Sequence, residues 1–360
     1  MKILLLGGTG AMGVPLSKIL SKQGHEVFVT SRSKRTSADN ITFIQANAKE
    51  LELLKNILSK DKYDAIVDFL VYNTKELEER VELFLDSTSQ YVFISSCRVF
   101  DITTEKITEK TPRILDVTKD EEFLKTDDYS LTKARQEDLL FNNEKKNWTI
   151  IRPSLTYNNR HFPLGPLEKE QWLYRSLHGR SIVFSEDMKN VEAALAYGND
   201  VAKSIASLLG NEKALGEDFN IASEQSVSWG GYLSIYLTIL KEKGFTPNVV
   251  YGQTCVKLKA NEKDSQILYA RGVNRHFDCS KLKDAGAYEM REPYEGFKEA
   301  LTDFLNRPSF YAIDWMLEAW SDKESGEFTS LCEIPTFKSK IKYLIFRFGL
   351  EKLLYALKRR

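Results

Sequence analysis

Residues 1–20 read MKILLLGGTGAMGVPLSKIL and carry the strongest indication of the fold. The apolar run 3–6 leads directly into glycines, three of which, Gly7, Gly10 and Gly13, are spaced three apart before an apolar pattern of helical period. Glycine permits a tight turn, close approach of the backbone to a pyrophosphate, and close packing of a helix on a strand. The stretch therefore predicts a strand, an anion-binding turn and a helix whose N-terminus carries partial positive charge. The alternative is a simple strand-to-helix turn.

The same alternation continues through the first 155 residues. Short apolar runs bounded by turn residues indicate strands at 2–7, 26–31, 41–46, 64–70, 90–96 and 148–154. Segments of helical period separate them at 13–22, 49–59, 74–85 and 130–142. Repeated βαβ units with right-handed crossovers predict an α/β fold, a Rossmann-type doubly wound parallel sheet with helices on both faces.

The pattern loosens after Pro153, although 199–210 still resembles a helix and 218–223 a further strand. We predict a nucleotide-binding domain over 1–155 and a smaller C-terminal cap over 156–310 that binds substrate and is interleaved with the last sheet elements. Residues 311–360 form a C-terminal extension.

Composition excludes several classes of protein. The 360 residues are 42% apolar, and 51 Lys and Arg balance 51 Asp and Glu, so no overall field attracts nucleic acid. The cysteines Cys97, Cys255, Cys279 and Cys332 are far apart, which fits neither a disulfide framework nor a zinc site. We expect no metal site and a cytoplasmic location.

The last residues are basic and amphipathic. Between Lys338 and Arg360 there are eight Lys and Arg against one Glu, and apolar residues recur at helical spacing with an interruption at Gly349. Such a helix packs against its own domain or a sister subunit of a homodimer. The alternative is contact with a partner or with an anionic membrane surface.

The second predicted strand ends in Thr30, Ser31 and Arg32, without the acidic residue that accepts hydrogen bonds from the ribose hydroxyls of NAD. An acid would repel a 2′-phosphate, whereas Arg32 can bind it bidentately. The sequence therefore favours NADP over NAD. Alternatively, these basic residues belong to a solvated loop.

Tyr129 and Lys133 are four residues apart on a predicted helix, so both side chains lie on one face. An ammonium group one turn away, together with the positive ring of an oxidised nicotinamide, favours the phenolate and lowers the pKa of the phenol. Ser96 ends a predicted strand, where a hydroxyl can donate to a substrate oxygen. We expect Ser96 to have this role and its neighbour Ser95 to be structural. The alternative is that Tyr129 and Lys133 lie on an ordinary amphipathic surface helix without a catalytic role.

The glycine motif, "FISSCRVF" (93–100), Tyr129-x-x-x-Lys133 and "IIRPS" (150–154) occur in the order found in extended short-chain dehydrogenase/reductases. Over about residues 1 to 310 the chain resembles the NAD(P)-dependent epimerase/dehydratase family. The resemblance implies that Ser96, Tyr129 and Lys133 are catalytic. It implies cofactor contacts, in addition to Tyr129 and Lys133, by Gly7, Thr9, Gly10, Ala11, Met12, Gly13, Ser31, Arg32, Asn47, Ala48, Leu70, Pro153 and Ser154. It also implies a substrate-binding loop that contains Asn158, Asn159, Arg160 and His161.

Three departures from the family pattern are visible. Asn47 stands where an Asp is usual, Leu70 and Val71 replace small residues beside the cofactor, and Phe100 replaces a Tyr. These features resemble the branch of plant chloroplast stem-loop-binding proteins. The first hypothesis is an NAD(P)-dependent epimerase, dehydratase or reductase acting on a carbohydrate, such as a nucleotide sugar. The second is a non-catalytic protein that senses the cofactor or binds RNA on the same fold, which the neutral charge balance disfavours.

Overall fold

The computed structural model describes residues 1–252, 265–288 and 290–350. Cys255 and the last ten residues of the basic tail lie outside this part of the chain. The chain forms two compact units, each assembled from three segments: the first comprises 1–158, 194–226 and 275–296, and the second 159–193, 227–274 and 297–360. The predicted division into 1–155, 156–310 and 311–360 remains a prediction about separately folding domains.

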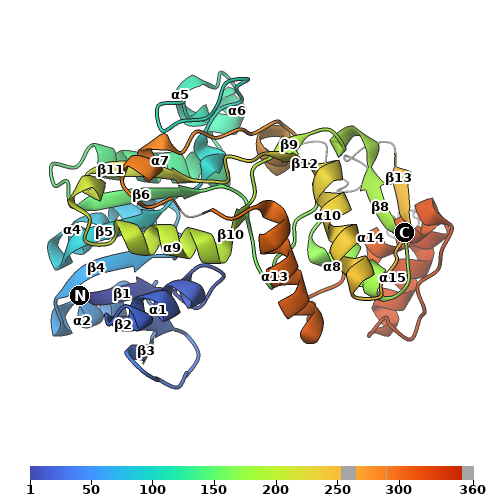
Figure 1. Ribbon diagram of the computed structural model, residues 1–360, viewed down its shortest axis with the longest axis horizontal. Helices are drawn as coiled ribbons and strands as arrows, with labels where there is room; N and C mark the ends of the chain where they lie inside the picture. The colour runs from blue at the N-terminus through green and yellow to red at the C-terminus, as the bar shows by residue number, and fades with distance from the viewer. Residues whose placement is uncertain (253–264, 289, 351–360) are drawn as a thin grey trace, which may run out of the picture. The chain divides into compact units, whose positions relative to one another are not determined.

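The first unit contains a seven-stranded parallel sheet in the order β11-β6-β5-β4-β1-β2-β3 (Figure 1). Its strands are β1 (Lys2–Leu6), β2 (Glu26–Ser31), β3 (Ile41–Gln45), β4 (Tyr63–Asp68), β5 (Thr88–Ile94), β6 (Trp148–Pro153) and β11 (Glu217–Ile221). The chain moves outward from β1 to β3 and then returns to the other side with β4, so the strand order reverses between β1 and β4. This topology confirms the doubly wound, Rossmann-type sheet.

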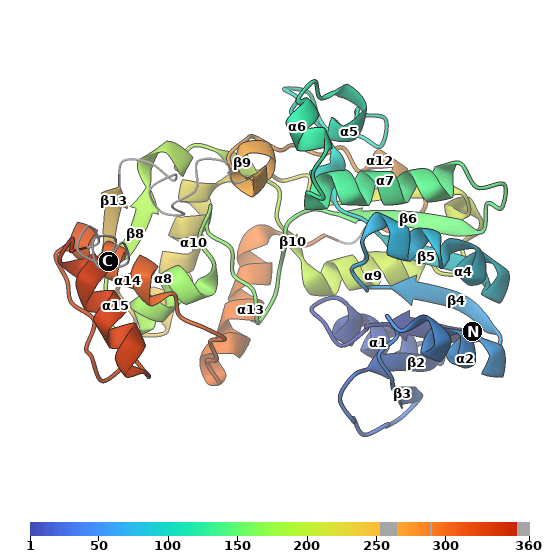
Figure 2. The same cartoon turned by 180° about the vertical axis from the view of Figure 1, so that it is seen from behind.

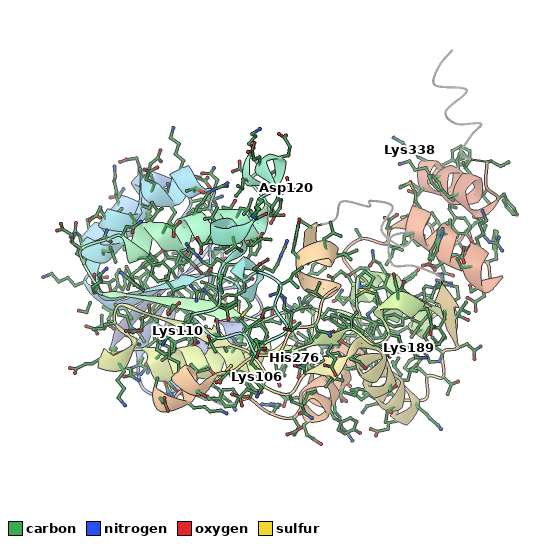
Figure 3. The ribbon with its side chains drawn as sticks, turned by 90° about the horizontal axis from the view of Figure 1, so that it is seen from above. Lys106, Lys110, Asp120, Lys189, His276 and Lys338 are labelled. Carbon is green, nitrogen blue, oxygen red and sulfur yellow. The ribbon has the colours of Figure 1, made fainter. Side chains whose placement is uncertain are left out.

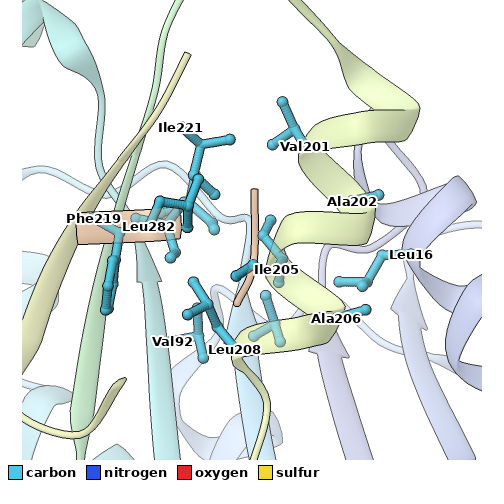
Figure 4. Packing of buried hydrophobic residues seen from close by; sticks show 14 of the residues in the cluster. Leu16, Val92, Val201, Ala202, Ile205, Ala206, Leu208, Phe219, Ile221 and Leu282 are labelled. Atoms are coloured by element: carbon cyan, nitrogen blue, oxygen red, sulfur yellow. The ribbon is translucent and has the colours of Figure 1, made fainter. Parts of the chain in front are cut away.

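Alternating strand residues divide the core into two layers. Ile3 and Leu5 of β1 face the cluster that includes α1 (Gly13–Lys22) and α9 (Gly198–Leu208), which Figure 4 shows from close by. Leu4 and Leu6 face the opposite cluster, which includes residues of α2 (Leu51–Lys60), α4 (Val81–Ser87) and α7 (Tyr129–Phe141), visible from behind in Figure 2. Burial on both faces explains why the parallel strands are continuously apolar in sequence.

The predicted helix over 74–85 is wrong as a single element, because it is divided into α3 (Thr74–Glu78) and α4. Arg80 between them has non-helical φ and ψ and is only 5% exposed. Its guanidinium donates to the carbonyl oxygen of Lys49 at 2.9 Å and lies over the ring of Tyr72. Drawing this cation inward interrupts the helical pattern, which apolar spacing alone did not reveal.

Smaller elements complete the first unit. They are β7 (Thr156–Tyr157), β10 (Ala196–Tyr197), α5 (Ile114–Val117), α6 (Glu121–Leu124), α12 (Ser280–Asp284) and the 3-10 turns Cys97–Val99 and Glu212–Ala214. β7 and β10 pair in parallel just beyond β6 and before α9. They carry the chain out of the sheet at its carboxyl edge.

The second unit combines helices with two short sheets. Its elements are α8 (Lys169–Leu177), β8 (Ile182–Ser185), η2 (Glu186–Met188), β9 (Glu192–Ala193), β12 (Val227–Ser228), α10 (Trp229–Glu242), β13 (Val249–Gly252), η4 (Ile267–Arg271), most of α13 (Pro293–Asn306), α14 (Trp315–Ser325) and α15 (Phe337–Arg347). β8 pairs in parallel with β13, and β9 pairs antiparallel with β12. Aromatic rings fill the interior, where Tyr236 contacts both Trp172 and Phe297.

A buried ion cluster fastens α14 to α8. Arg175 is fully buried and pairs with Glu318 at 2.8 Å, Asp322 at 2.9 Å and Glu327 at 2.9 Å. Arg180 pairs with Glu318 at 3.0 Å. A buried charge is tolerated only when it is paired and hydrogen-bonded, so these contacts fix the C-terminal helices to this unit.

α15 packs on α14 through one face. The ring of Tyr343 is fully buried, and its hydroxyl donates to Asp322 at 2.7 Å and accepts from the amide of Thr329 at 2.8 Å. Arg347 donates to the carbonyl oxygen of Glu327 at 3.0 Å. Within the described residues, packing on its own unit therefore accounts for one face of this basic helix.

Candidate active site

The candidate site lies at the carboxyl edge of the sheet, where the strand order reverses. β1 and β4 are neighbours there, with Leu6 opposite Asp68, and Asp68 is in turn opposite Phe93 of β5. Open α/β sheets bind ligands outside the strand ends at this reversal point. The sequence-predicted glycine loop and Ser96 both follow strands that end at this edge.

The glycine loop has the geometry of a phosphate cradle. Gly7 has φ of +66°, which favours glycine, and its amide donates to Thr30 Oγ1 at 2.9 Å. A Cβ atom on Gly13 would lie 2.5 Å from Gly8 Cα, so only glycine permits this approach of α1 to the loop. A Cβ atom on Gly10 would meet no protein atom within 4 Å. The loop is therefore open at Gly10, where a bound pyrophosphate would approach the backbone.

The first turn of α1 has no side-chain cap, although the Val14 amide donates to the Gly10 carbonyl oxygen at 3.1 Å, the Leu16 amide donates to the Met12 carbonyl oxygen at 3.0 Å, and Pro15 has no N–H. The N-cap residue Met12 makes no side-chain capping hydrogen bond, and no acidic residue occupies the first turn. Thr9 is half-buried and Ala11 is exposed, so both flank the open part of the loop. These features fit the phosphate groups of a dinucleotide, because a helix N-terminus stabilises an anion through its dipole.

Asp68 shapes the edge beside the loop, and sequence reasoning missed it. It is 1% exposed and accepts hydrogen bonds from the Leu70 amide at 3.0 Å and the Tyr91 hydroxyl at 3.0 Å. Burial raises the pKa of Asp68 to about 6. The turn that it stabilises brings Leu70 against the loop, since a Cβ atom on Gly7 would lie 2.7 Å from Leu70 Cδ2.

The end of β2 presents a guanidinium without a partner. Arg32 is exposed, and within the described residues its side chain forms no hydrogen bond or ion pair. Ser31 is buried, donates to the Ser33 carbonyl oxygen at 2.8 Å and accepts from Arg35 at 3.3 Å. The basic loop is therefore partly ordered by Ser31, while Arg32 is available to a ligand.

Two predicted adenine-side residues follow β3. Asn47 is half-buried and donates to Glu50 Oε1 at 3.0 Å, and Ala48 is buried. The side-chain amide of Asn47 is therefore already hydrogen-bonded within the turn that follows β3. Any contact with adenine remains a prediction.

The two serines at the end of β5 have different surroundings. Ser95 is 2% exposed and donates to Glu137 Oε1 at 2.6 Å. Ser96 caps the following 3-10 turn by accepting from the Arg98 amide at 3.2 Å, and its interaction with Tyr129 lowers the pKa of that phenol. Ser95 thus lies in the buried scaffold, whereas Ser96 lies beside the candidate acid/base.

Tyr129 begins α7 next to Ser96 and Arg98. Its ring is 38% exposed, and the guanidinium carbon of Arg98 lies 5.2 Å from the ring centroid. Desolvation raises the pKa of Tyr129, while the hydrogen bond to Ser96 and the charge of Arg98 lower it. Without a ligand the phenol is protonated at neutral pH and can donate a proton.

Lys133 lies one turn further along α7 and is only 2% exposed. Its Nζ donates to the carbonyl oxygen of Ile94 at 2.8 Å and lies 4.5 Å from the Phe93 ring centroid. Burial lowers the pKa of Lys133 to about 8, while the charges of Asp68 and Glu137 oppose that shift. The ammonium form therefore predominates at neutral pH and is lost under mildly alkaline conditions.

A buried ion pair anchors α7 to the sheet. Glu137 lies two turns after Tyr129, is fully buried, and receives two hydrogen bonds from Arg152 of β6, at 2.7 and 2.9 Å. Arg113 reaches the same carboxylate at 3.4 Å. The pair fixes the helix that carries Tyr129 and Lys133, and no periodic pattern in the sequence indicated it.

Pro153 ends β6 and is followed by Ser154, whose hydroxyl is buried without a hydrogen-bond partner within the described residues. A buried hydroxyl without a partner is unfavourable, which points to a ligand or water beside it. Asn158, the last residue of the first segment of this unit, is also buried. These residues extend the candidate site from the loop along the sheet edge.

The other predicted substrate residues belong to the second unit. Asn159 and Arg160 are exposed, and Asn159 donates to Asp303. His161 pairs with Glu168 at 2.8 Å, and Glu168 also pairs with Arg271. Despite the opposing effect of burial, these partners lower the pKa of Glu168 to about 2. The contacts with substrate remain predictions.

The protein-family model described as "NAD dependent epimerase/dehydratase family" matches residues 3–222. The chain belongs to this family. Membership supports an NAD-dependent enzyme of the oxidoreductase type. The matched segment contains the glycine loop, Ser96, Tyr129 and Lys133, and it ends just beyond β11.

One curated relative is "Chloroplast stem-loop binding protein of 41 kDa b, chloroplastic" from Arabidopsis thaliana, 29% identical over 247 residues. The match covers 64% of this chain and 61% of that protein. A dTDP-glucose 4,6-dehydratase from Bacillus anthracis, solved with NAD, superposes with a TM-score of 0.63 at 18% identity, covering 86% of this chain and 97% of that one. A UDP-glucuronic acid 4-epimerase from Bacillus cereus superposes with a TM-score of 0.63 at 16% identity. The superposition covers 86% of this chain and 100% of that one. The two structures support the fold.

Within the described residues, no group of three or more His, Cys, Asp and Glu side chains could hold a metal ion.

Proposed function

We propose that this family member is an NAD(P)-dependent epimerase, dehydratase or reductase that acts on a carbohydrate, with Tyr129 as acid/base. The observation that supports this assignment most strongly is the surroundings of Tyr129. Its phenol is partly exposed beside Ser96 and Arg98, both of which lower its pKa, and Lys133 follows one turn later on the same helix face.

The dinucleotide supplies hydride acceptance and donation when it is bound. The glycine loop, open at Gly10, and the positive end of the α1 dipole would hold its pyrophosphate, and Ser154 offers a hydroxyl without a partner within the described residues further along the edge. The charge of Arg98 lowers the pKa of Tyr129 and so favours the phenolate, while Lys133, one turn later on α7, donates to the Ile94 carbonyl oxygen at the end of β5. Tyr129 can therefore take a proton from a substrate hydroxyl and return it in the reverse direction.

Ser96 completes the proton-transfer geometry. Its hydroxyl contacts Tyr129 and lies beside the strand end, where a substrate oxygen would lie within reach of both side chains. Ser95 is engaged by Glu137 and cannot fill this role without breaking a buried contact. The reaction that follows the initial hydride transfer determines whether the enzyme is an epimerase, a dehydratase or a reductase.

We infer a preference for NADP from Arg32. Its exposed guanidinium has no partner within the described residues, and β2 ends without an acid. Arg32→Ala should weaken NADP binding by about tenfold or more and leave NAD binding nearly unchanged, since a charge-assisted contact contributes about 1.5–3 kcal/mol. Lys34→Ala, an exposed neighbour, is the matched control. Equal losses for both cofactors would refute the preference.

We propose a nucleotide-linked sugar as substrate. The support is that a protein of this fold, the epimerase from Bacillus cereus, was solved in complex with UDP-glucuronic acid and NAD. A thermal-shift screen of NAD, NADP and nucleotide sugars tests this directly. A ligand at a hundredfold its Kd stabilises the folded state by about 2.7 kcal/mol. The absence of a shift with every nucleotide sugar, tested alone and with each cofactor, would refute the proposal.

Tyr129→Phe separates catalysis from binding. General acid/base catalysis contributes about 10²–10⁴-fold, so the variant should lose turnover by that factor and retain cofactor affinity. Ser95→Ala is not a suitable control because it disrupts the buried scaffold. Ser33→Ala in the exposed basic loop is preferable and should leave turnover unchanged.

The alternative function is binding of RNA or sensing of the cofactor without turnover. The observation that favours RNA is the 29% identity to a protein named for stem-loop binding. Phosphate contacts give a steep dependence on salt concentration. RNA binding of this kind that persists in Tyr129→Phe, with no turnover on any sugar nucleotide, would favour the alternative. The free Cys97, Cys279 and Cys332 suit the reducing cytoplasm that we propose for either function.

A further inference from the structure

The outer face of α15 is apolar and exposed. Phe337 is 78% exposed, Ile341 43%, Phe348 61% and Leu350 44%. Phe337, Ile341 and Phe348 recur at helical spacing along α15 and its C-cap, so they form one stripe, which we call the outer stripe together with Leu350. Tyr343 lies on the opposite side, buried against α14. The helix therefore has two distinct apolar faces, of which residues in the described part of the chain cover only one.

Lysines flank the outer stripe. At 100° per residue, Lys338 borders it on one side and Lys340 on the other, and Lys342 lies further round the helix beyond Lys338. None of the three forms an ion pair within the described residues, and α15 contains no acidic residue. Lys338 is labelled in Figure 3. Unpaired lysines beside exposed Phe and Ile side chains suit a surface whose outer layer is negatively charged and whose interior is apolar.

The helix is held in a fixed setting. Tyr343 is fixed by Asp322 and Thr329, Thr336 caps the helix by accepting from the Ser339 amide at 3.1 Å, and Arg347 reaches Glu327. The outer stripe is thus presented by a folded helix pair rather than being ordered by its ligand. Less ordering entropy is lost on binding when the bound conformation already exists.

We propose that the outer stripe and its lysines dock the protein on an anionic membrane surface. A second copy of the chain fits less well, since a two-fold contact through this stripe would bring like charges together. RNA fits less well because Ile341 and Leu350 have no ring on which a base could stack. Within the described residues no helix is long and apolar enough to cross a bilayer, so the contact is peripheral.

Flotation of the full chain with lipid vesicles tests the proposal. We expect binding to vesicles of phosphatidylcholine mixed with phosphatidylglycerol, little binding to phosphatidylcholine alone, and release by salt. Lys338→Glu with Lys342→Glu should weaken binding by about tenfold or more, since each surface cation contributes about 1 kcal/mol. Phe337→Ser with Ile341→Ser should also weaken it by at least about tenfold, through lost apolar burial.

Matched controls keep the result specific. Lys110→Glu with Lys119→Glu makes the same charge change at exposed sites in the first unit, and Tyr311→Ser removes an aromatic that is 81% exposed in the second unit. Both controls should bind vesicles like the wild type. Because all these side chains are exposed, thermal unfolding should be unchanged, which separates lost docking from misfolding.

Other outcomes overturn the proposal. Equal binding to charged and uncharged vesicles, or unchanged binding of the outer-stripe variants, would refute it. If the stripe variants instead abolish self-association in solution while vesicles are never bound, the stripe is a subunit interface. If they abolish binding of a stem-loop RNA, it is a nucleic-acid site. Cofactor-induced thermal shifts of the stripe variants should match the wild type, so this test stands apart from that of the proposed enzyme.

Discussion

The sheet edge of the first unit and the C-terminal helix pair of the second are held by different interactions. The edge is built from local patterns: a strand, a glycine turn and a helix that are adjacent in sequence. The α14–α15 pair is secured by Arg175, which lies 143 residues before its partner Glu318. Local patterns can be recognised in a sequence. A buried ion cluster between distant segments cannot, because charged residues are expected on the surface.

The largest expected effect tests the second region. Arg175→Met would leave Glu318 and Asp322 buried beside one another with a cation removed. Breaking a buried ion pair on one side costs about 3–5 kcal/mol. We expect the variant to unfold at a clearly lower denaturant concentration than the wild type.

The matched control is Lys145→Met. Lys145 also pairs with two carboxylates, Glu82 at 3.0 Å and Asp86 at 2.5 Å, but on the surface. Exposed pairs contribute little, so the control should unfold close to the wild type. Similar destabilisation by both substitutions would mean that burial is not what makes the Arg175 cluster important, and the contrast between the two regions would fail.

The next effect tests the sheet edge. Gly10→Ala adds a methyl group that meets no protein atom within 4 Å, so unfolding should be unchanged. The added methyl would occupy the space where a pyrophosphate approaches the backbone, and dinucleotide affinity should fall at least about tenfold, or 1.4 kcal/mol. Calorimetric titration with each cofactor measures this. Unchanged affinity would show that the loop does not hold the phosphates.

Much of the first unit follows from its sequence. The six expected strands match β1 to β6 with small differences at their ends, because apolar runs buried on both faces leave a clear signal. The choice of Ser96 over Ser95 agrees with their surroundings, since the position just beyond a strand end faces the ligand edge. The catalytic roles themselves remain predictions.

The parts that could not be predicted involve buried polar residues. Arg80 divides a helix by turning inward, Glu137 and Arg152 pair beneath the site, and Asp68 sets the turn that carries Leu70. In the sequence each resembles an ordinary surface charge. Their positions depend on which partner the fold brings near, and neither hydrophobic periodicity nor residue spacing records that.

A smaller effect shows how the site lowers stability. The pKa of Lys133 falls from 10.5 to about 8, so the folded state binds this proton less tightly than the unfolded state does. The resulting loss of stability is complete below pH 8 and disappears above about pH 10.5. Lys133→Met removes this cost but leaves the Ile94 carbonyl oxygen unpaired, which costs about 1–3 kcal/mol. We expect the variant to be about as stable as the wild type at pH 7 and less stable at pH 10.5. Denaturant unfolding at both pH values measures the difference, and a variant equally destabilised at both would contradict the lowered pKa.

The smallest expected effect concerns Arg98, whose charge lowers the pKa of Tyr129. Arg98→Met should raise that pKa, so Tyr129 should ionise at a higher pH, whereas Arg98→Lys keeps the charge and should move it little. Phenolate absorbance, corrected with Tyr129→Phe to isolate one tyrosine, measures the shift. Because the Arg98 side chain is 23% exposed and its guanidinium also lies 3.8 Å from Asp128, the shift should be modest and shrink further in high salt. A titration unaffected by Arg98→Met at low salt would leave Arg98 as a packing contact for the ring, and Ser96 as the main side chain that tunes the phenol within its own unit.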